Sequence, residues 1–244
     1  MKKRAWIFAV AALAAAAVAG LLLYNGVIHF NNPSIRKYPV RGVDVSAYQG
    51  TIHWDVLSRQ DSLYFAYIKA TAGSDLKDKS FETNWTHAKN TDLAVGAYHL
   101  MRFDSPGWAQ ADHFISVVPN EEGSLPPAVD VELYGEDRRN PPSKEAADGI
   151  LKALLEKLEA HYGKKPVIYA TQSAYKRYIS GDYTAYPIWI RNVFTKPILS
   201  DKREWTFWQY SGRQVLKGYE GEQRFIDMNV FNGTKEEFDE LFKR

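Results

Sequence analysis

The stretch PPAVDVELYGE at residues 126–136 places two carboxylates inside a segment with the composition of a buried β-strand. Because side chains alternate across a strand, Asp130 and Glu132 share one face with Tyr134, while three aliphatic residues share the other face. Carboxylates this close drive each other's pKa apart, so that one can act as an acid while the other stays ionised. An isolated pair of this kind is more often part of a solvated edge strand, so its meaning depends on the rest of the chain.

Strand-like runs and helical patterns alternate on both sides of this stretch, which is typical of βα units around a parallel sheet. Five expected strands are each followed by a helical pattern: RGVDVS (41–46), LYFAYIKAT (63–71), AVGAYHL (94–100), PPAVDVEL (126–133) and PVIYAT (166–171). Three more strands follow without regular helices between them: YPIWIR (186–191), EWTFWQYS (204–211) and RFIDMNVF (224–231). This order predicts an α/β fold, a single closed TIM-like barrel that lacks its last helices. Thr234 and Glu237 form a capping box for a closing helix.

The composition of the chain excludes several classes of function. At 244 residues and 45% hydrophobic content, the chain is long enough to bury one core, so we expect one soluble domain and a monomer. Its 31 basic and 29 acidic residues are spread evenly and give a net charge of +2, which argues against a nucleic-acid partner. The absence of cysteine excludes thiol catalysis and disulfide bonds.

The first 24 residues predict a membrane anchor. A basic cluster at residues 2–4 precedes an uncharged apolar run to Tyr24, close to the roughly 20 residues that a bilayer needs. Cleavage at the A-x-A motif of residues 17–19 is the alternative, but the apolar run continues through three leucines beyond it. We therefore expect a single-pass anchor at residues 1–24, a tether at 25–40 and a barrel at 41–244. The positive-inside rule places that barrel in the periplasm or outside the cell.

Two further strands carry acids on one face. Asp44 lies in GVDVS and Asp227 lies in FIDMNV, each alternating with aliphatic residues as Asp130 does. Barrel active sites form at the C-terminal ends of the strands, where the first, fourth and eighth strands converge. Several carboxylates in a chain with 14% aromatic residues suit glycoside hydrolysis, in which one acid protonates the leaving oxygen and another group stabilises the reacting carbon.

Metal binding is the rival interpretation of these acids. Asp44, Asp130, Glu132 and Asp227 have oxygen ligands that suit Mg²⁺ or Ca²⁺. The sequence contains no EF-hand loop, no phosphate-binding glycine loop and no H-E-x-x-H motif, and its six histidines lack ligand spacing. We therefore expect neither a metal nor a cofactor.

An ordered set of motifs resembles glycoside hydrolase family 25, the Chalaropsis-type lysozymes. The motifs are RGVDVSAYQG (41–50), YIKATAG (67–73), GAYHL (96–100), PPAVDVE (126–132), VIYAT (167–171), PIWIR (187–191), FWQYS (207–211) and IDMNVF (226–231). The resemblance covers essentially all of the barrel domain. It implies a (β/α)5β3 barrel and an N-acetylmuramidase that cleaves the β-1,4 bond between N-acetylmuramic acid and N-acetylglucosamine in peptidoglycan glycan strands.

The resemblance also implies roles for individual residues. Glu132 matches the general acid of the family, Asp130 matches the neighbouring assisting acid, and Asp44 and Asp227 match the other acids of the cleft. Five residues fall where family motifs line the sugar groove: Tyr98, Tyr169, Trp189, Trp208 and Gln209. The chain departs from the family at Ala72, where A-T-E-G has become A-T-A-G, and after D-x-S, where Ala47-Tyr48 displaces the usual aromatic residue.

Two functions follow from these patterns. The first is a membrane-tethered muramidase that faces outward, since all four acids of the cleft are retained. The second is a catalytically inactive module that keeps the groove and attaches the membrane to peptidoglycan, a hypothesis motivated by the acid missing at Ala72.

Overall fold

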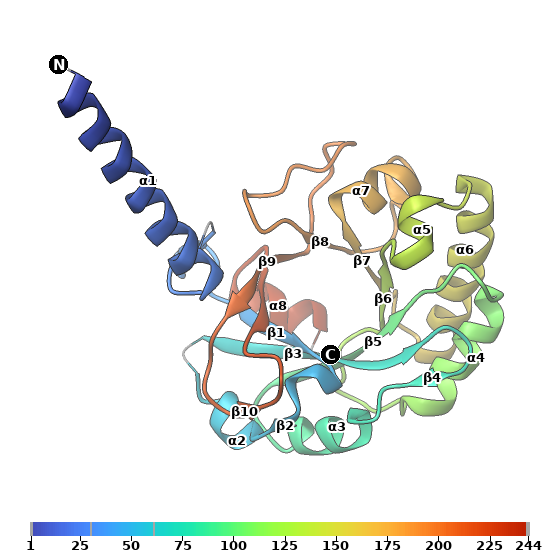
Figure 1. Cartoon of the computed structure of the whole chain (residues 1–244). Coiled ribbons are helices and arrows are strands. Elements are labelled where there is room, and N and C mark those ends of the chain that lie inside the picture. Colours follow the sequence, from blue (N-terminus) through green and yellow to red (C-terminus); the bar gives the residue numbers. More distant parts are fainter. Residues whose placement is uncertain (1, 30, 61, 243–244) are drawn as a thin grey trace.

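Pairing of the first and last strands closes the sheet into an eight-stranded barrel (Figure 1). The computed structural model describes the chain except for residues 1, 30, 61 and 243–244. Strand β1 (Arg41–Val45) pairs in parallel with β3 (Leu63–Ala72) and antiparallel with β11 (Ile226–Phe231). Between β3 and β11 run, in order, β5 (Ala94–Leu100), β6 (Ala128–Val131), β7 (Val167–Thr171), β8 (Ile188–Arg191) and β9 (Phe207–Gln214). Only β11 runs antiparallel to its barrel neighbours among these described strands.

Helices follow the first five barrel strands, as the sequence predicts, so the expected fold class is confirmed. An outer ring surrounds this part of the barrel (Figure 1), formed by α2 (Trp54–Leu57), α3 (Phe81–Lys89), α4 (Gly107–Val117), α6 (Lys144–Tyr162) and α7 (Gln172–Ala174). A short helix α5 (Gly135–Arg139) was not predicted. Minor elements are a 3-10 turn (Ala47–Gln49), a π turn (Tyr175–Ile179), β2 (Thr51–Ile52), β4 (Leu76–Lys77) and β10 (Tyr219–Glu220).

Alternation along the strands creates two separate cores. Aliphatic residues point outward from the barrel and form one core with the inner faces of the helices, to which Val129, Ile168 and Leu154 of α6 belong. Aromatic residues fill the inside, among them Phe65, Tyr67, Trp189 and Phe207. Small residues make room for these rings: a Cβ atom at Gly42 would lie 2.3 Å from the Phe65 ring. The end of the barrel where the parallel strands begin is therefore a packed aromatic core.

Helix α8 (Lys235–Phe242) closes the end of the barrel opposite the C-terminal ends of the parallel strands (Figure 1). The predicted capping box forms, because Glu237 accepts from the Thr234 amide at 2.7 Å and Thr234 accepts from the Glu237 amide at 3.2 Å. Because the helix begins at this position, Phe238 points toward the barrel, where it is fully buried. Its ring centroid lies 5.6 Å from that of Phe65 and 5.4 Å from that of Phe231.

Helix α1 (Lys2–Tyr24) projects away from the barrel (Figure 1). Its segment Trp6–Tyr24 is long and apolar enough to cross a membrane, and none of its most apolar window is buried in the protein. A signal sequence near the N-terminus has the same properties.

We predict that Phe238→Ala lowers the free energy of unfolding by about 3–5 kcal/mol, because it removes a ring from a close-packed core and leaves a cavity. Urea denaturation followed by aromatic circular dichroism measures this change. Leu241→Ala is the matched control in the same helix, since Leu241 is 63% exposed. Equal effects of the two substitutions would show that α8 does not seal the barrel.

Candidate active site

A cavity of about 440 Å³ opens at the C-terminal ends of the parallel strands. The four acids singled out from the sequence all line it: Asp44, Asp130, Glu132 and Asp227. Three come from β1, β6 and β11, and Glu132 directly follows β6, so strand order brings together residues almost 200 positions apart. Asp44 and Asp227 occupy directly paired positions on antiparallel strands, and their side chains therefore share the inner face.

Asp44 is held by two amide side chains. Gln209 Nε2 and Asn229 Nδ2 donate to its Oδ2 atom at 2.9 and 2.7 Å. Burial raises the pKa of Asp44 to about 6, although both hydrogen bonds favour the ionised form and oppose this change. Asn229 is fixed in turn by Trp189, whose Nε1 donates to Asn229 Oδ1 at 2.8 Å. These bonds orient the carboxyl group of Asp44 before any substrate binds.

The pKa of Asp227 and that of Asp130 are also raised well above the usual range. Burial is the largest cause for both groups. The charge of Asp44 adds to the rise for Asp227, and the charge of Glu132 adds to the rise for Asp130. Two cations act in the opposite direction, Arg191 on Asp227 and Lys69 on Asp130. Burial in the cavity therefore favours the protonated form of these acids more than water does.

Glu132 lies beyond the end of its strand, whereas the three aspartates lie within theirs. Strand β6 ends at Val131, two residues earlier than the sequence indicated, so Glu132 lies on the rim and is only partly buried. The Tyr134 hydroxyl donates to Glu132 Oε2, and the Tyr169 hydroxyl lies 3.5 Å from Glu132 Oε1. Tyr169 also donates to Gln209 Oε1 at 2.9 Å. One tyrosine thus contacts both Glu132 and the amide that holds Asp44.

Most of the expected groove residues line the cavity, but Trp208 does not. Tyr98, Tyr169, Trp189 and Gln209 face it. Trp208 lies in the outer core, where its Nε1 donates to the Asn192 carbonyl at 2.7 Å and its ring meets those of Tyr38, Trp205 and Tyr210. The prediction for Trp208 was wrong because neighbouring strand residues point to opposite sides, so Trp208 and Gln209 cannot both face the groove.

Sequence reasoning missed the cations of the site. Lys69, Arg138 and Arg191 line the cavity beside the acids. Alternation could have found two of them, because Lys69 shares a face with Tyr67 and Arg191 shares a face with Trp189. Arg138 lies on α5, which no sequence pattern indicated. Within the described residues, no three His, Cys, Asp or Glu side chains are arranged to hold one metal ion.

The family model of Glycosyl hydrolases family 25 matches residues 43–219, most of the barrel. The chain belongs to glycosyl hydrolase family 25. This membership confirms the resemblance, and it makes the chain a glycoside hydrolase.

Solved and curated proteins agree with this family 25 assignment. A family 25 glycosyl hydrolase from Bacillus anthracis has 49% identity and a TM-score of 0.83, covering 88% of this chain and 98% of that chain. The bacterial lysozyme from Streptomyces coelicolor has 32% identity and a TM-score of 0.75, covering 84% of this chain and 97% of that chain. Lysozyme M1 from Streptomyces globisporus is 33% identical over 212 residues, which is 80% of this chain and 68% of that protein.

We predict that this family 25 chain loses stability as the pH rises from 4 to 6. Over this range unfolded Asp44 releases a proton that folded Asp44, with its pKa of about 6, still holds, so the free energy of unfolding falls. The full change for this group is about 3 kcal/mol. Urea titrations at several pH values measure the fall.

Asp44→Asn should make this decrease smaller, because the amide does not titrate. Asp92→Asn, at an exposed position between α3 and β5, is the matched control. An unchanged pH dependence in Asp44→Asn would mean that Asp44 ionises in the folded protein as it does in water.

Proposed function

We propose that the chain is a membrane-anchored lysozyme that acts as a monomer on peptidoglycan in the periplasm or outside the cell. It cleaves the β-1,4 bond between N-acetylmuramic acid and N-acetylglucosamine, with Glu132 as general acid and Asp130 assisting. The observation that carries this proposal is the convergence of four acids with aromatic side chains, Tyr98, Tyr169 and Trp189 among them, in one cavity. The lysozymes among its relatives support the choice of substrate.

Glu132 suits proton donation because it lies at the rim of the cavity, where the oxygen of the leaving sugar can reach it. As the glycosidic C–O bond breaks, Glu132 gives its proton to that oxygen. A water molecule forms the new C–O bond at the anomeric carbon, and the proton that it loses is taken up by a carboxylate of the cavity. Tyr134 and Tyr169 contact the two carboxyl oxygens and orient the group. The rings of Tyr98, Tyr169 and Trp189 offer apolar faces to the sugars.

Asp130 suits a supporting role. Its Oδ1 atom is buried and has no hydrogen-bond partner among the described residues. A buried acceptor without a partner is costly in the free protein and gains a bond when a substrate N–H approaches. The acetamido group of an N-acetylated sugar carries such an N–H. Asp130 would therefore position that group beside the reacting carbon.

The alternative, an inactive wall-binding module, was motivated by Ala72. Ala72 is buried at the end of β3, where it pairs with Leu100 and with Leu76. It does not belong to the lining of the cavity, whereas all four acids do. These positions favour the enzyme over the module.

Glu132→Gln should reduce hydrolysis of purified peptidoglycan by about 10²- to 10⁴-fold, because an amide cannot donate the required proton. The melting temperature should stay the same or rise, since one charge leaves an acidic cavity. Asp130→Asn should also slow the reaction, and Glu136→Gln, on exposed α5, is the matched control. The assay counts new reducing ends and identifies them after borohydride reduction.

Muramitol is the expected reduced product. Glucosaminitol would mean that the enzyme is a glucosaminidase. Near-wild-type hydrolysis by Glu132→Gln would remove this residue as the acid. Binding of peptidoglycan by the wild type without new reducing ends would favour the wall-binding module.

The proposed anchor rests on the exposed apolar segment Trp6–Tyr24 and the basic residues before it. Full-length protein should stay in the membrane fraction through high-salt and alkaline washes, because a spanning helix is held by the hydrophobic effect rather than by charge. A chain truncated just before Val40 should be soluble. A mature N-terminus at Gly20 would contradict the anchor and indicate a cleaved signal peptide.

A further inference from the structure

A second hollow, of about 380 Å³, lies between the end of α1 and strands β8 and β9. Most of its wall is apolar, and the main contributors are Gly20, Leu23, Ile28, Val193, Phe194 and Tyr210. Two further wall residues, Arg191 and Gly212, also line the catalytic cavity. The two spaces are therefore neighbours that share a wall.

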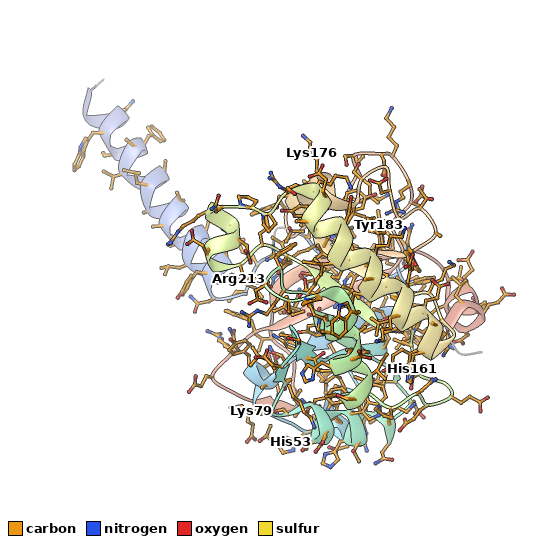
Figure 2. The ribbon with its side chains drawn as sticks, turned by 90° about the vertical axis from the view of Figure 1, so that its right-hand side faces the viewer. His53, Lys79, His161, Lys176, Tyr183 and Arg213 are labelled. Atoms are coloured by element: carbon orange, nitrogen blue, oxygen red, sulfur yellow. The ribbon has the colours of Figure 1, made fainter. Side chains whose placement is uncertain are left out.

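The joint between the helix and the barrel is packed. Arg213 Nη1 donates to the Tyr24 carbonyl at 2.6 Å, and the guanidinium lies 5.1 Å from the Tyr24 ring and 5.3 Å from the Phe225 ring. Figure 2 shows Arg213 at the barrel end of the helix. Gly26, with φ of 66°, allows close approach, because a Cβ atom there would lie 2.4 Å from the Arg213 carbonyl oxygen. Phe225 lines the catalytic cavity, so the anchor ends against the wall of that cavity.

The hollow extends to membrane depth if α1 spans the bilayer. The apolar segment ends at Tyr24, and Gly20 lies four residues further into it, which is about 6 Å along a helix. Its inner end, at Gly20 and Leu23, would therefore face hydrocarbon, and its outer end, at Arg191, borders the acids. An apolar passage that joins a bilayer to a glycan-cleaving cavity suits a ligand with a hydrocarbon part and a sugar part.

We infer that the hollow receives the hydrocarbon chain of a lipid-linked glycan, a strand whose reducing end is joined through a diphosphate to a long membrane lipid. This inference rests on the proposed function and narrows its substrate class to glycan still attached to the membrane. Arg191 and Arg213 line the hollow and offer guanidinium groups that suit a diphosphate. Hydrolysis of one glycosidic bond by water would then free the strand from its lipid-bearing end.

The test uses the full chain in lipid nanodiscs with two substrates. One is a peptidoglycan oligomer carrying the lipid diphosphate in the same discs, and the other is the same oligomer with a free reducing end. Gly20→Trp fills the hollow, since a Cβ atom at Gly20 meets nothing within 4 Å. Leu21→Trp is the matched control, because Leu21 is 60% exposed and does not line the hollow.

The measured quantity is the rate of hydrolysis of the lipid-linked oligomer divided by that of the free oligomer. We expect Gly20→Trp to lower this ratio by about tenfold or more relative to wild type, which corresponds to a tenfold weaker binding of the lipid-linked substrate. Leu21→Trp should keep the wild-type ratio, although both variants meet the substrate in the same discs. Equal ratios in all three proteins would overturn the inference and indicate that bulk phospholipid, rather than the lipid chain of the substrate, occupies the hollow. Failure of wild type to cleave even the free oligomer would refute the proposed function, and the inference with it.

Discussion

Closure of the barrel sets two acids directly opposite each other, and the active cavity depends on how the chain supports that pair. Asp44 of β1 and Asp227 of β11 are register partners on antiparallel strands. Like charges at such positions are destabilising. A slip of one residue would relieve the contact, but it would also turn Asn229 and the rest of β11 to the other face. The chain instead keeps the register, and burial holds the pKa of both acids high.

The side chains that support this pair come from neighbouring strands, where alternation points them into the barrel. Gln209 of β9 and Asn229 of β11 donate to Asp44, and Arg191 of β8 opposes the rise in pKa of both acids. The same alternation places Tyr169 where it contacts Gln209 and Glu132. The buried acids and the side chains that hold them therefore follow from one rule, that every second residue of a closed barrel faces its interior.

Patterns of local periodicity predicted the eight strands, the five βα units and the four acids, because each depends on short-range alternation or spacing. The errors have physical causes. Trp208 was assigned to the groove from its motif, although its neighbour Gln209 already occupied the inner face. The rim position of Glu132 depends on where β6 stops pairing, and α5 has no apolar stripe to indicate it. The contact between Asn229 and Asp44 depends on strand order, which no local pattern contains.

Stabilising and functional layers are separated along the barrel axis. Towards α8, the interior is closed by rings such as Phe65, Phe207 and Phe238, whose burial stabilises the fold through the hydrophobic effect. Towards the C-terminal ends of the parallel strands, the interior carries buried acids that oppose folding when they ionise. A chain without cysteine cannot offset that opposition with disulfide bonds, so its acids depend on the aromatic layer beneath them. The packed end of the barrel is thus what allows the open end to remain acidic, hollow and ready to bind.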